Sequence, residues 1–246
     1  MKLCVIGGAG ARSAFLTKSL VKSARDIRVD HIVLLDNDQQ KLKTYGEISR
    51  ELARRLDTGV DYIITTIRAG EDAGRLFDEQ TCLAHGVLGQ ETTGAGGFAM
   101  AIRSVPTLVY YCTLAREVAN PGHLIFNFTN PSGIITQALR SKGFDNVYGI
   151  CDAPSGFIKQ LEEILEIPYG TLDIECYGLN HLSWFRNAKV NGRDVQRELL
   201  DNPRTYEHSE MRLFTREMAR ISGDCMLNEY LYFYYRRVKS LSMIQK

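Results

Sequence analysis

The sequence has no excess of charge of either sign, because 30 lysine and arginine residues stand against 29 aspartate and glutamate residues among 246 positions. A protein that binds nucleic acid through its phosphates normally carries a clustered basic excess. With 44% hydrophobic and 24% charged residues, the composition is that of an ordinary soluble globular protein. We therefore expect a chain of one or two domains without a nucleic-acid partner.

The sequence also lacks paired cysteines and a long apolar run at its start. Its six cysteines have no CxxC spacing, which argues against a disulfide framework or a closed structural zinc site and favours a reducing compartment. The apolar residues 1–6 run directly into glycine and are too short for a signal peptide or a membrane span. We expect a cytoplasmic protein without a membrane partner.

A glycine-rich stretch follows this first apolar run. It reads Gly7-Gly8-Ala9-Gly10-Ala11-Arg12-Ser13 and leads into a helical pattern over residues 15–24. Strand, glycine turn and helix form the context of a phosphate-binding unit, because small residues let the backbone approach a pyrophosphate and the helix N-terminus supplies amide donors. Gly7, Gly8 and Gly10 are therefore candidate cofactor-binding residues, although the match to the full G-x-G-x-x-G motif ends in a serine.

A second apolar run, residues 31–35, ends in Asp36. An acid at the end of the second strand binds a ribose hydroxyl of a dinucleotide, and its charge would repel a 2′-phosphate, so it favours NAD over NADP. The alternative is a plain αβ repeat in which Asp36 only caps the next helix. The order of strand, glycines, helix, strand and acid favours the nucleotide-binding interpretation.

Strands and helices alternate over the first 152 residues, and this regularity predicts a doubly wound parallel sheet of Rossmann type. The expected further strands are residues 61–66, 123–128 and 146–150, and the expected further helices are residues 41–56, 73–85 and 98–118. After Cys151 come a helix over 155–165, an apolar run over 172–177 and a hairpin signal at Asn191-Gly192. We expect an α/β protein with an NAD-binding domain, residues 1–152, and a mixed α+β catalytic domain, residues 153–246.

Polar residues follow several of these strands, at the edge where a sheet of this kind binds its ligands. The glycine-dense loop over residues 89–97 is either a plain connection or a contact for substrate or nicotinamide. Asn130 precedes a proline, which biases it away from helix and lets its amide point into the crevice. Cys151 and Asp152 follow the last strand of the series.

Cys151 and His181, about thirty residues apart, are candidate metal ligands. A thiolate and an imidazole suit a divalent transition metal, with the remaining positions left for water or substrate oxygens. The alternative is packing, because free cysteine is among the most buried residue types.

Four motifs in this order resemble glycoside hydrolase family 4, the NAD- and metal-dependent glycosidases, many of which cleave 6-phosphoglycosides. Members of this family depart from the usual two-carboxylate mechanism. The resemblance implies the lactate/malate dehydrogenase-like fold. The motifs are Gly89-Gln90-Glu91-Thr92-Thr93-Gly94-Ala95-Gly96-Gly97, Asn127-Phe128-Thr129-Asn130-Pro131-Ser132-Gly133, Gly149-Ile150-Cys151-Asp152-Ala153-Pro154 and Gly178-Leu179-Asn180-His181-Leu182-Ser183-Trp184.

The resemblance implies a reaction in which NAD takes hydride from carbon 3 of the sugar, so that the proton on carbon 2 becomes acidic. A base removes that proton, the group on carbon 1 is eliminated, water adds, and the hydride is returned. A metal that binds the oxygens at carbons 2 and 3 would stabilise the enediolate-like charge.

Residue by residue, Cys151 and His181 match the metal ligands of the family, which most often bind manganese. Asp152 matches the general acid of the α-specific enzymes, although some relatives assigned to β-linkages also carry aspartate there. Arg75 and Asn130 match substrate contacts. The resemblance thus implies a phosphorylated sugar substrate and leaves the anomer open.

Tyr230 matches the tyrosine base of the family, with Tyr232 and Tyr234 as alternative counterparts. The unperturbed pKa of a tyrosine is about 10, so a nearby cation such as the metal would have to lower it for work at neutral pH.

Family members continue well past residue 246, so the resemblance implies an incomplete catalytic domain, and it also implies a homo-oligomer. Two alternatives stay open. The first is an NAD-dependent dehydrogenase with net hydride transfer. The second is a non-catalytic, truncated NAD-binding paralogue.

Overall fold

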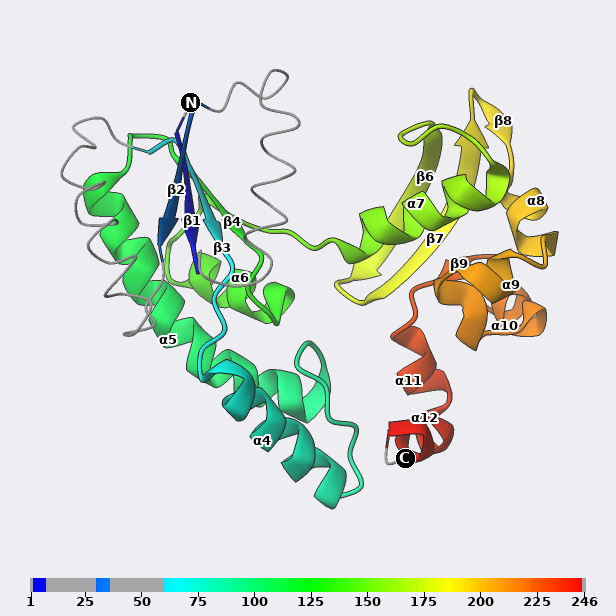
Figure 1. Ribbon diagram of the computed structural model, residues 1–246, viewed down its shortest axis with the longest axis horizontal. Coiled ribbons are helices and arrows are strands. Elements are labelled where there is room, and N and C mark those ends of the chain that lie inside the picture. The colour runs from blue at the N-terminus through cyan, green and yellow to red at the C-terminus, as the bar shows by residue number, and fades with distance from the viewer. Residues whose placement is uncertain (1, 8–29, 36–59, 245–246) are drawn as a thin grey trace. The chain divides into compact units, whose positions relative to one another are not determined.

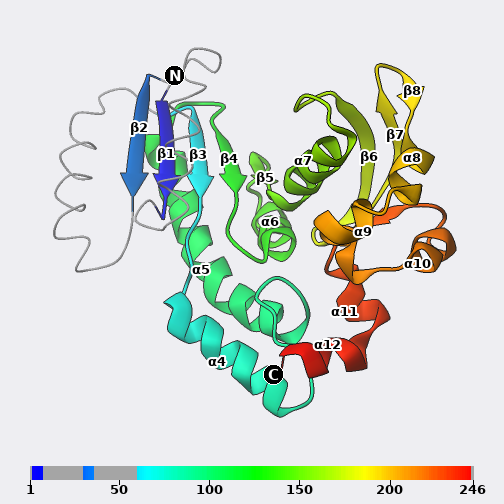
Figure 2. The ribbon, with the colours of Figure 1, turned by 45° about the vertical axis from the view of Figure 1, so that its right-hand side comes forward.

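The computed structural model describes residues 2–7, 30–35 and 60–244. They belong to two compact units, which Figures 1 and 2 show in two views. Unit 1 comprises Met1–Cys82 and Gly89–Ile150, and unit 2 comprises Leu83–Leu88 and Cys151–Lys246. The helices expected over residues 15–24 and 41–56 lie outside the described residues.

Unit 1 contains a five-stranded sheet with the order β2-β1-β3-β4-β5, and every pair of neighbours is parallel. The strands are β1 (Lys2–Ile6), β2 (His31–Leu35), β3 (Tyr62–Thr65), β4 (Leu124–Asn127) and β5 (Val147–Gly149). The strands are largely apolar, with a single polar residue at one end of β1, β2, β3 and β4, as is usual in parallel sheets. The order reverses beside β1, as it does in doubly wound folds. The predicted α/β fold of Rossmann type is confirmed.

Three described helices connect these strands. They are α4 (Glu71–Ala84), α5 (Gly94–Val118) and α6 (Ser132–Ser141). Leu108 and Cys112 of α5 pack with Ile63 and Ile125 of the sheet in one apolar core. By length and composition α5 would also be able to cross a membrane, but a core helix of a globular protein meets the same criterion.

Helix α5 begins four residues earlier than the sequence predicts, because the glycines of the loop belong to its first turn. A Cβ atom on Gly96 would lie 2.8 Å from the carbonyl oxygen of Gln90, and one on Gly97 would lie 2.9 Å from the carbonyl carbon of Thr92. Glycine is therefore needed at both positions for a close approach between the helix and the preceding loop. The density of glycine reflects packing rather than a loose connection.

The carboxyl ends of the strands are joined by backbone hydrogen bonds that continue past the sheet. The Thr66 amide donates to Ile6 at 2.7 Å, the Phe128 amide to Thr65 at 2.9 Å, and the Ile150 amide to Asn127 at 2.9 Å. These bonds place the segments that follow β3, β4 and β5 along one edge of the sheet.

Unit 2 contains a second, antiparallel sheet in which β6, β7 and β8 are neighbours and β9 pairs with β7. Its strands are β6 (Leu172–Leu179), β7 (Leu182–Val190), β8 (Arg193–Asp194) and β9 (Met226–Leu227). Its helices are α7 (Ala153–Leu165), α8 (Gln196–Asp201), α9 (Thr205–His208), the 3₁₀ helix η1 (Glu210–Leu213), α10 (Arg216–Ile221), α11 (Leu231–Tyr235) and α12 (Arg237–Ile244).

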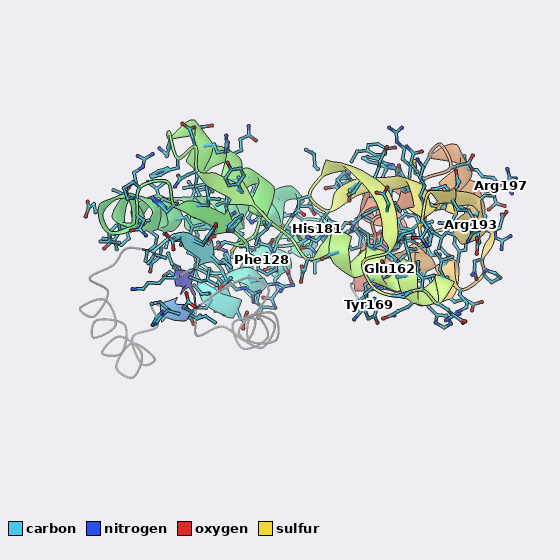
Figure 3. All side chains as sticks on the ribbon, turned by 90° about the horizontal axis from the view of Figure 1, so that it is seen from above. Phe128, Glu162, Tyr169, His181, Arg193 and Arg197 are labelled. Atoms are coloured by element: carbon cyan, nitrogen blue, oxygen red, sulfur yellow. The ribbon has the colours of Figure 1, made fainter. Side chains whose placement is uncertain are left out.

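The core of unit 2 lies between α7 and the antiparallel sheet. The rings of Phe157 and Phe185 are fully buried and meet edge to face, with 4.9 Å between their centroids. The buried carboxylate of Glu162, labelled in Figure 3, accepts hydrogen bonds from the backbone amides of Thr171 and Leu172. The helix and the start of β6 are thereby connected through both apolar and polar contacts.

The hairpin predicted at Asn191-Gly192 is confirmed. It joins β7 to β8, and the φ angles of Asn191 and Gly192 are 51° and 80°. Positive φ at both central residues is the requirement of a type I′ turn, which asparagine followed by glycine meets at low cost.

Substitution of Gly178 in β6 tests whether the turn that leads to His181 requires glycine at this position. Its φ is +122°, and a Cβ atom there would lie 2.3 Å from the carbonyl oxygen of Leu182. We expect Gly178→Ala to lower the free energy of unfolding by roughly 3 kcal/mol, from backbone strain together with overpacking. Urea denaturation measures this, with Gly156→Ala in α7 as the control.

The control glycine has nothing within 4 Å of the position of its Cβ atom. Alanine is about 0.5–1 kcal/mol more favourable than glycine inside a helix, so Gly156→Ala is expected to stabilise the protein slightly. Equal effects of the two substitutions would contradict the close approach at Gly178.

Candidate functional site

Cys151 and His181, the predicted metal ligands, lie together in unit 2. The Sγ atom of Cys151 is 3.4 Å from Nε2 of His181. Two atoms that bind one divalent ion at about 2.3 Å (sulfur) and about 2.0 Å (nitrogen) lie roughly 3 to 4 Å apart. The pair therefore fits two ligands of one ion in both donor type and separation. Among the described residues, no group of three or more His, Cys, Asp or Glu side chains could hold a metal.

The turn between β6 and β7 places His181 beside the cysteine. Its φ is +58°, in the left-handed region that a residue with a Cβ atom enters only at a cost. Such a conformation persists where the surrounding structure determines it. Here the pairing of Leu179 with Leu182 closes the hairpin on either side of His181.

Tyr230 lies against His181. The two rings are stacked, with 4.4 Å between centroids and 21° between planes. Strand β9 brings the tyrosine there, because Leu227 pairs with Trp184 of β7 and the Asn228 amide donates to the carbonyl of Ser183. Of the three tyrosines considered from the sequence, Tyr230 contacts the predicted metal ligand.

Asp152 immediately precedes α7 and is the residue at the N-cap of that helix. Its carboxylate does not cap the helix; Oδ1 lies 3.8 Å from the Sγ atom of Cys151. The structure therefore brings together in unit 2 four residues predicted to act in metal binding or catalysis: Cys151, Asp152, His181 and Tyr230.

Burial raises the pKa of the Cys151 thiol, and the hydrogen bond from the Ala153 amide opposes this rise. The neighbouring carboxylate of Asp152 adds to it. A thiol in these surroundings keeps its proton at neutral pH unless a cation displaces it.

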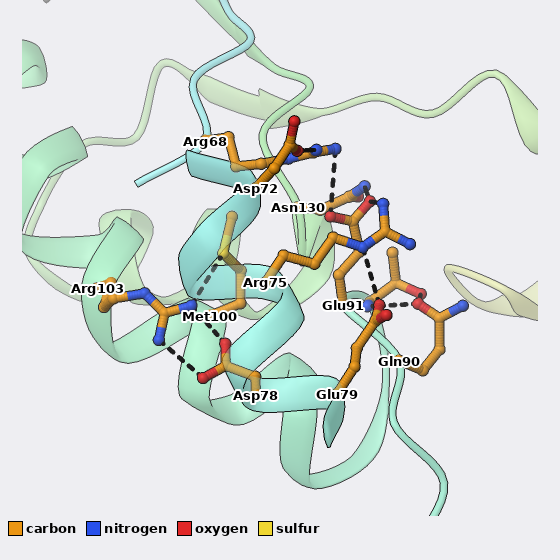
Figure 4. A network of polar contacts seen from close by, with 11 residues as sticks. Arg68, Asp72, Arg75, Asp78, Glu79, Gln90, Glu91, Met100, Arg103 and Asn130 are labelled. Atoms are coloured by element: carbon orange, nitrogen blue, oxygen red, sulfur yellow. Dashed lines mark hydrogen bonds and ion pairs between the residues drawn. The ribbon is translucent and has the colours of Figure 1, made fainter. Parts of the chain in front are cut away.

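Arg75 and Asn130, the predicted substrate contacts, lie in unit 1 and meet at Glu91 (Figure 4). The Asn130 Nδ2 atom donates to Glu91 Oε1 at 3.3 Å, and Nη1 of Arg75 is 3.6 Å from the same oxygen. Arg75 also pairs with Glu79, one turn along α4, at 2.8 Å. Glu91 thus holds an amide and a guanidinium in one place.

Arg68 completes this cluster. Its Nη2 atom is 3.4 Å from Glu91 Oε2, and its Nη1 atom pairs with Asp72. Glu91 is buried with 8% of its surface exposed, and its Oε2 accepts no hydrogen bond within the described part of the chain. Two arginines and a buried carboxylate with spare acceptor capacity suit a polar, anionic ligand that also carries hydroxyl groups.

Gly7 is the one predicted cofactor residue that the structure describes. Its φ is +88°, and a Cβ atom there would lie 2.8 Å from the backbone of Thr66. Glycine is needed because the segment after β3 passes closely over the end of β1. Gly8, Gly10 and Asp36 lie outside the described residues.

Four polar residues beside these clusters were not singled out from the sequence: Arg68, Glu91, Glu210 and Asn228. Glu91 lies within a recognised motif, so its place in the glycine loop was a usable signal. Glu210 gives no local signal, because its contacts are to residues 18 and 19 positions away.

Burial raises the pKa of the Glu210 carboxyl from 4.5 to about 7. The Glu229 amide and Arg212 oppose the rise, and the Glu229 carboxylate adds to it. Because the folded protein binds more protons than the unfolded chain between these values, this contribution to stability is complete below about pH 4.5 and is lost as the pH rises through about 7.

We therefore expect the free energy of unfolding of the original protein to fall by about 3 kcal/mol between acidic and mildly alkaline pH. Glu210→Gln should abolish this fall. Urea denaturation near pH 5 and near pH 8 measures it. The variant should be the more stable protein at the higher pH, because it cannot carry the buried charge. Parallel pH profiles of the variant and the original protein would contradict the shifted carboxyl.

Comparison with known proteins gives matches in both units. The sequence model described as "Family 4 glycosyl hydrolase" matches residues 54–167, and that described as "Family 4 glycosyl hydrolase C-terminal domain" matches residues 176–246.

The 6-phospho-beta-glucosidase BglT of Thermotoga maritima is 34% identical over 215 residues, which are 82% of this chain and 51% of that protein. The phospho-alpha-glucosidase PagL of Clostridium acetobutylicum is 31% identical over 225 residues, which are 82% and 50% of the two chains. The chain thus spans about half the length of these curated relatives.

Solved structures give the same result. The 6-phospho-beta glucosidase from Thermotoga maritima with NAD and glucose-6-phosphate matches with a TM-score of 0.85 at 31% identity, over 100% of this chain and 61% of that one. A 6-phospho-alpha-glucosidase from gut microorganisms in complex with NAD and Mn²⁺ matches with a TM-score of 0.83 at 25% identity, over 98% and 62%.

Proposed function

Because the chain belongs to family 4 of the glycosyl hydrolases, we propose that it hydrolyses 6-phosphoglucosides with the help of NAD and a divalent metal, manganese. The observation that carries this proposal is the cluster in unit 2. A thiol and an imidazole lie 3.4 Å apart, and a tyrosine ring is stacked on the imidazole. A cluster with this chemistry is more specific than a nucleotide-binding fold, which many dehydrogenases share.

Cys151 and His181 would hold the metal, and Gly7, Gly8, Gly10 and Asp36 would hold NAD. When bound, NAD supplies a reversible hydride acceptor and the metal supplies Lewis-acid stabilisation of negative charge on the sugar oxygens. The remaining coordination positions are left for water and substrate oxygens, since two protein ligands do not complete a shell.

Residues of the chain would carry out the proton transfers and orient the sugar. Tyr230 would remove the proton from carbon 2, because its side chain lies beside the metal-ligand pair, where a cation favours the phenolate. Asp152 would donate a proton to the departing oxygen on carbon 1. Arg75 and Asn130 would orient the sugar, with Glu91 fixing both side chains and offering Oε2 to a hydroxyl group.

Three further expectations belong to this proposal. The NAD-binding domain would be residues 1–152 and the partial catalytic domain residues 153–246. The protein would be cytoplasmic, where phosphorylated sugars and reduced thiols are both found. It would form a homo-oligomer.

Release of nitrophenol from the α- and β-nitrophenyl 6-phosphoglucosides tests the proposal. The assay is run under reducing conditions with and without NAD and Mn²⁺. Release that requires both additions is the expected result, and the faster anomer identifies the linkage. Accumulation of NADH would indicate a dehydrogenase instead, and NAD binding without release would contradict an active glycosidase.

A further inference from the structure

A buried polar group is connected by hydrogen bonds to the backbone of Tyr230, whose ring is stacked on His181. Its members are Glu210, Asn228 and Ser183, with 8%, 1% and 5% of their surfaces exposed. Glu210 begins the short helix η1, Asn228 follows β9, and Ser183 lies in β7. Three separate segments therefore meet in this group within unit 2.

A continuous series of hydrogen bonds runs from this group to Tyr230. A single oxygen of Glu210, Oε2, accepts from Asn228 Nδ2 at 2.9 Å and from the Glu229 amide at 3.1 Å. The Oδ1 atom of Asn228 in turn accepts from the Tyr230 amide at 3.2 Å. The backbone amides of Glu229 and Tyr230 are thus fixed by Glu210 and Asn228, respectively.

The same asparagine ties the series to the strand that carries the histidine. The Asn228 amide donates to the Ser183 carbonyl at 3.1 Å, two residues beyond His181. The Glu210 backbone is held from α7, because its amide donates to Gln160 Oε1 at 2.9 Å. The carboxylate is therefore a fixed point between the helix and the two segments that bear the stacked rings.

We propose that Glu210 is a positioning residue, which holds the Tyr230 ring against His181 through Asn228 and the Glu229 amide. It does not touch the reacting atoms. The inference rests on the proposed function only in that Tyr230 is the base there; the positioning itself is a property of the fold. Burial of the carboxyl raises its pKa to about 7, so the charged form is unfavourable at this position. Proteins retain such locally unfavourable groups mainly at functional sites.

The test compares Glu210→Ala with Glu210→Gln. Alanine removes the acceptor and leaves two buried donors without it, whereas glutamine keeps an oxygen able to accept both bonds. The readout is the NMR shift of the His181 ring protons, which the stacked tyrosine ring displaces. Tyr230→Leu defines the shift without stacking, and His181→Asn identifies the signal.

We expect Glu210→Ala to lose most of the ring-induced shift and Glu210→Gln to retain it. The ring signals of Phe157 and Phe185, which meet edge to face in the core of unit 2, report whether the rest of the unit is unchanged. Arg197→Ala is the matched control, because Figure 3 shows Arg197 at the end of unit 2 far from His181. If Glu210→Ala does not fold, Glu210→Asp replaces it in the test. Aspartate keeps the charge, but its shorter side chain moves the carboxylate away from the two donors. A full ring-induced shift in whichever of these two variants folds would overturn the proposal.

Kinetics give a second readout. Misplacing a reacting group by about 1 Å costs up to roughly a hundredfold in rate, so kcat should fall by roughly tenfold or more in Glu210→Ala, with KM changed far less and kcat restored in Glu210→Gln. If the original protein has no turnover but the shifts behave as expected, the proposed function fails and the positioning stands. Turnover that is insensitive to Glu210→Ala overturns the positioning.

Discussion

Replacement of Cys151 by alanine is expected to abolish both manganese binding and turnover. In the proposed site the thiol is one of two protein ligands, 3.4 Å from the other, and the described part of the chain contains no group of three or more His, Cys, Asp or Glu side chains that could hold a metal. Loss of Lewis-acid stabilisation worth several kcal/mol corresponds to a fall in kcat/KM of about 10³ or more. Isothermal titration with Mn²⁺ and the nitrophenol assay measure the two losses.

Cys176→Ala is the matched control. Cys176 is an exposed free thiol in β6 of the same unit, and it plays no part in the cluster. Its replacement should leave metal affinity and turnover unchanged. Equal losses in the two variants would mean that the effect of Cys151→Ala comes from general damage to unit 2.

The pH dependence of metal binding follows from the raised pKa of the Cys151 thiol. A metal binds the thiolate and must displace the proton, so affinity should rise about tenfold per pH unit below that pKa. Cys151→Ser should flatten this rise. A metal affinity that is independent of pH in the original protein would exclude the thiol as a ligand.

Replacement of Asn127 by leucine is expected to cost roughly 3 kcal/mol or more of the stability of unit 1. Asn127 is fully buried at the end of β4. Its Oδ1 accepts from the Thr65 hydroxyl at 2.8 Å and from the Thr129 amide at 3.2 Å, and its Nδ2 lies 3.2 Å from the Thr136 hydroxyl. Leucine fills a similar volume but leaves these buried groups without partners, at about 1–3 kcal/mol each.

The same substitution should raise KM, because the Asn127 side chain anchors the turn that carries Asn130. Asn146→Leu is the control, since Asn146 is only half-buried and its side chain donates one bond, to the His123 carbonyl at 3.0 Å. That control should cost about 1 kcal/mol. Urea denaturation that gives similar losses for the two variants would contradict the central role of Asn127.

The parts of the fold that follow local rules could be predicted from the sequence. The strands at residues 2–6, 31–35 and 62–65 are apolar runs of the kind that a covered parallel sheet needs, and Asn191-Gly192 has the chemistry of its turn. The candidate metal ligands Cys151 and His181 were identified from their residue types and from long motifs. Their closeness in space, 3.4 Å between Sγ and Nε2, is a result of the structure.

The other parts of the fold and of the candidate site depend on contacts between residues far apart in the sequence, which no local sequence pattern indicates. The start of α5 at Gly94 depends on how Gly96 and Gly97 pack against the preceding loop. The short helices α8, α9 and α10 have four to six residues each, too few for a helical period to be recognised. Glu210 is a buried acid whose partners are 18 and 19 residues away.

The most direct test of the central claim is to run the reaction in D₂O with NAD and Mn²⁺ and to examine the sugar product by NMR. Removal of the carbon 2 proton by Tyr230, followed by its return from solvent, predicts deuterium at carbon 2 of the released sugar phosphate, without net NADH. Hydrolysis with only hydrogen retained at carbon 2 would contradict the proposed role of the cluster formed by Cys151, His181 and Tyr230.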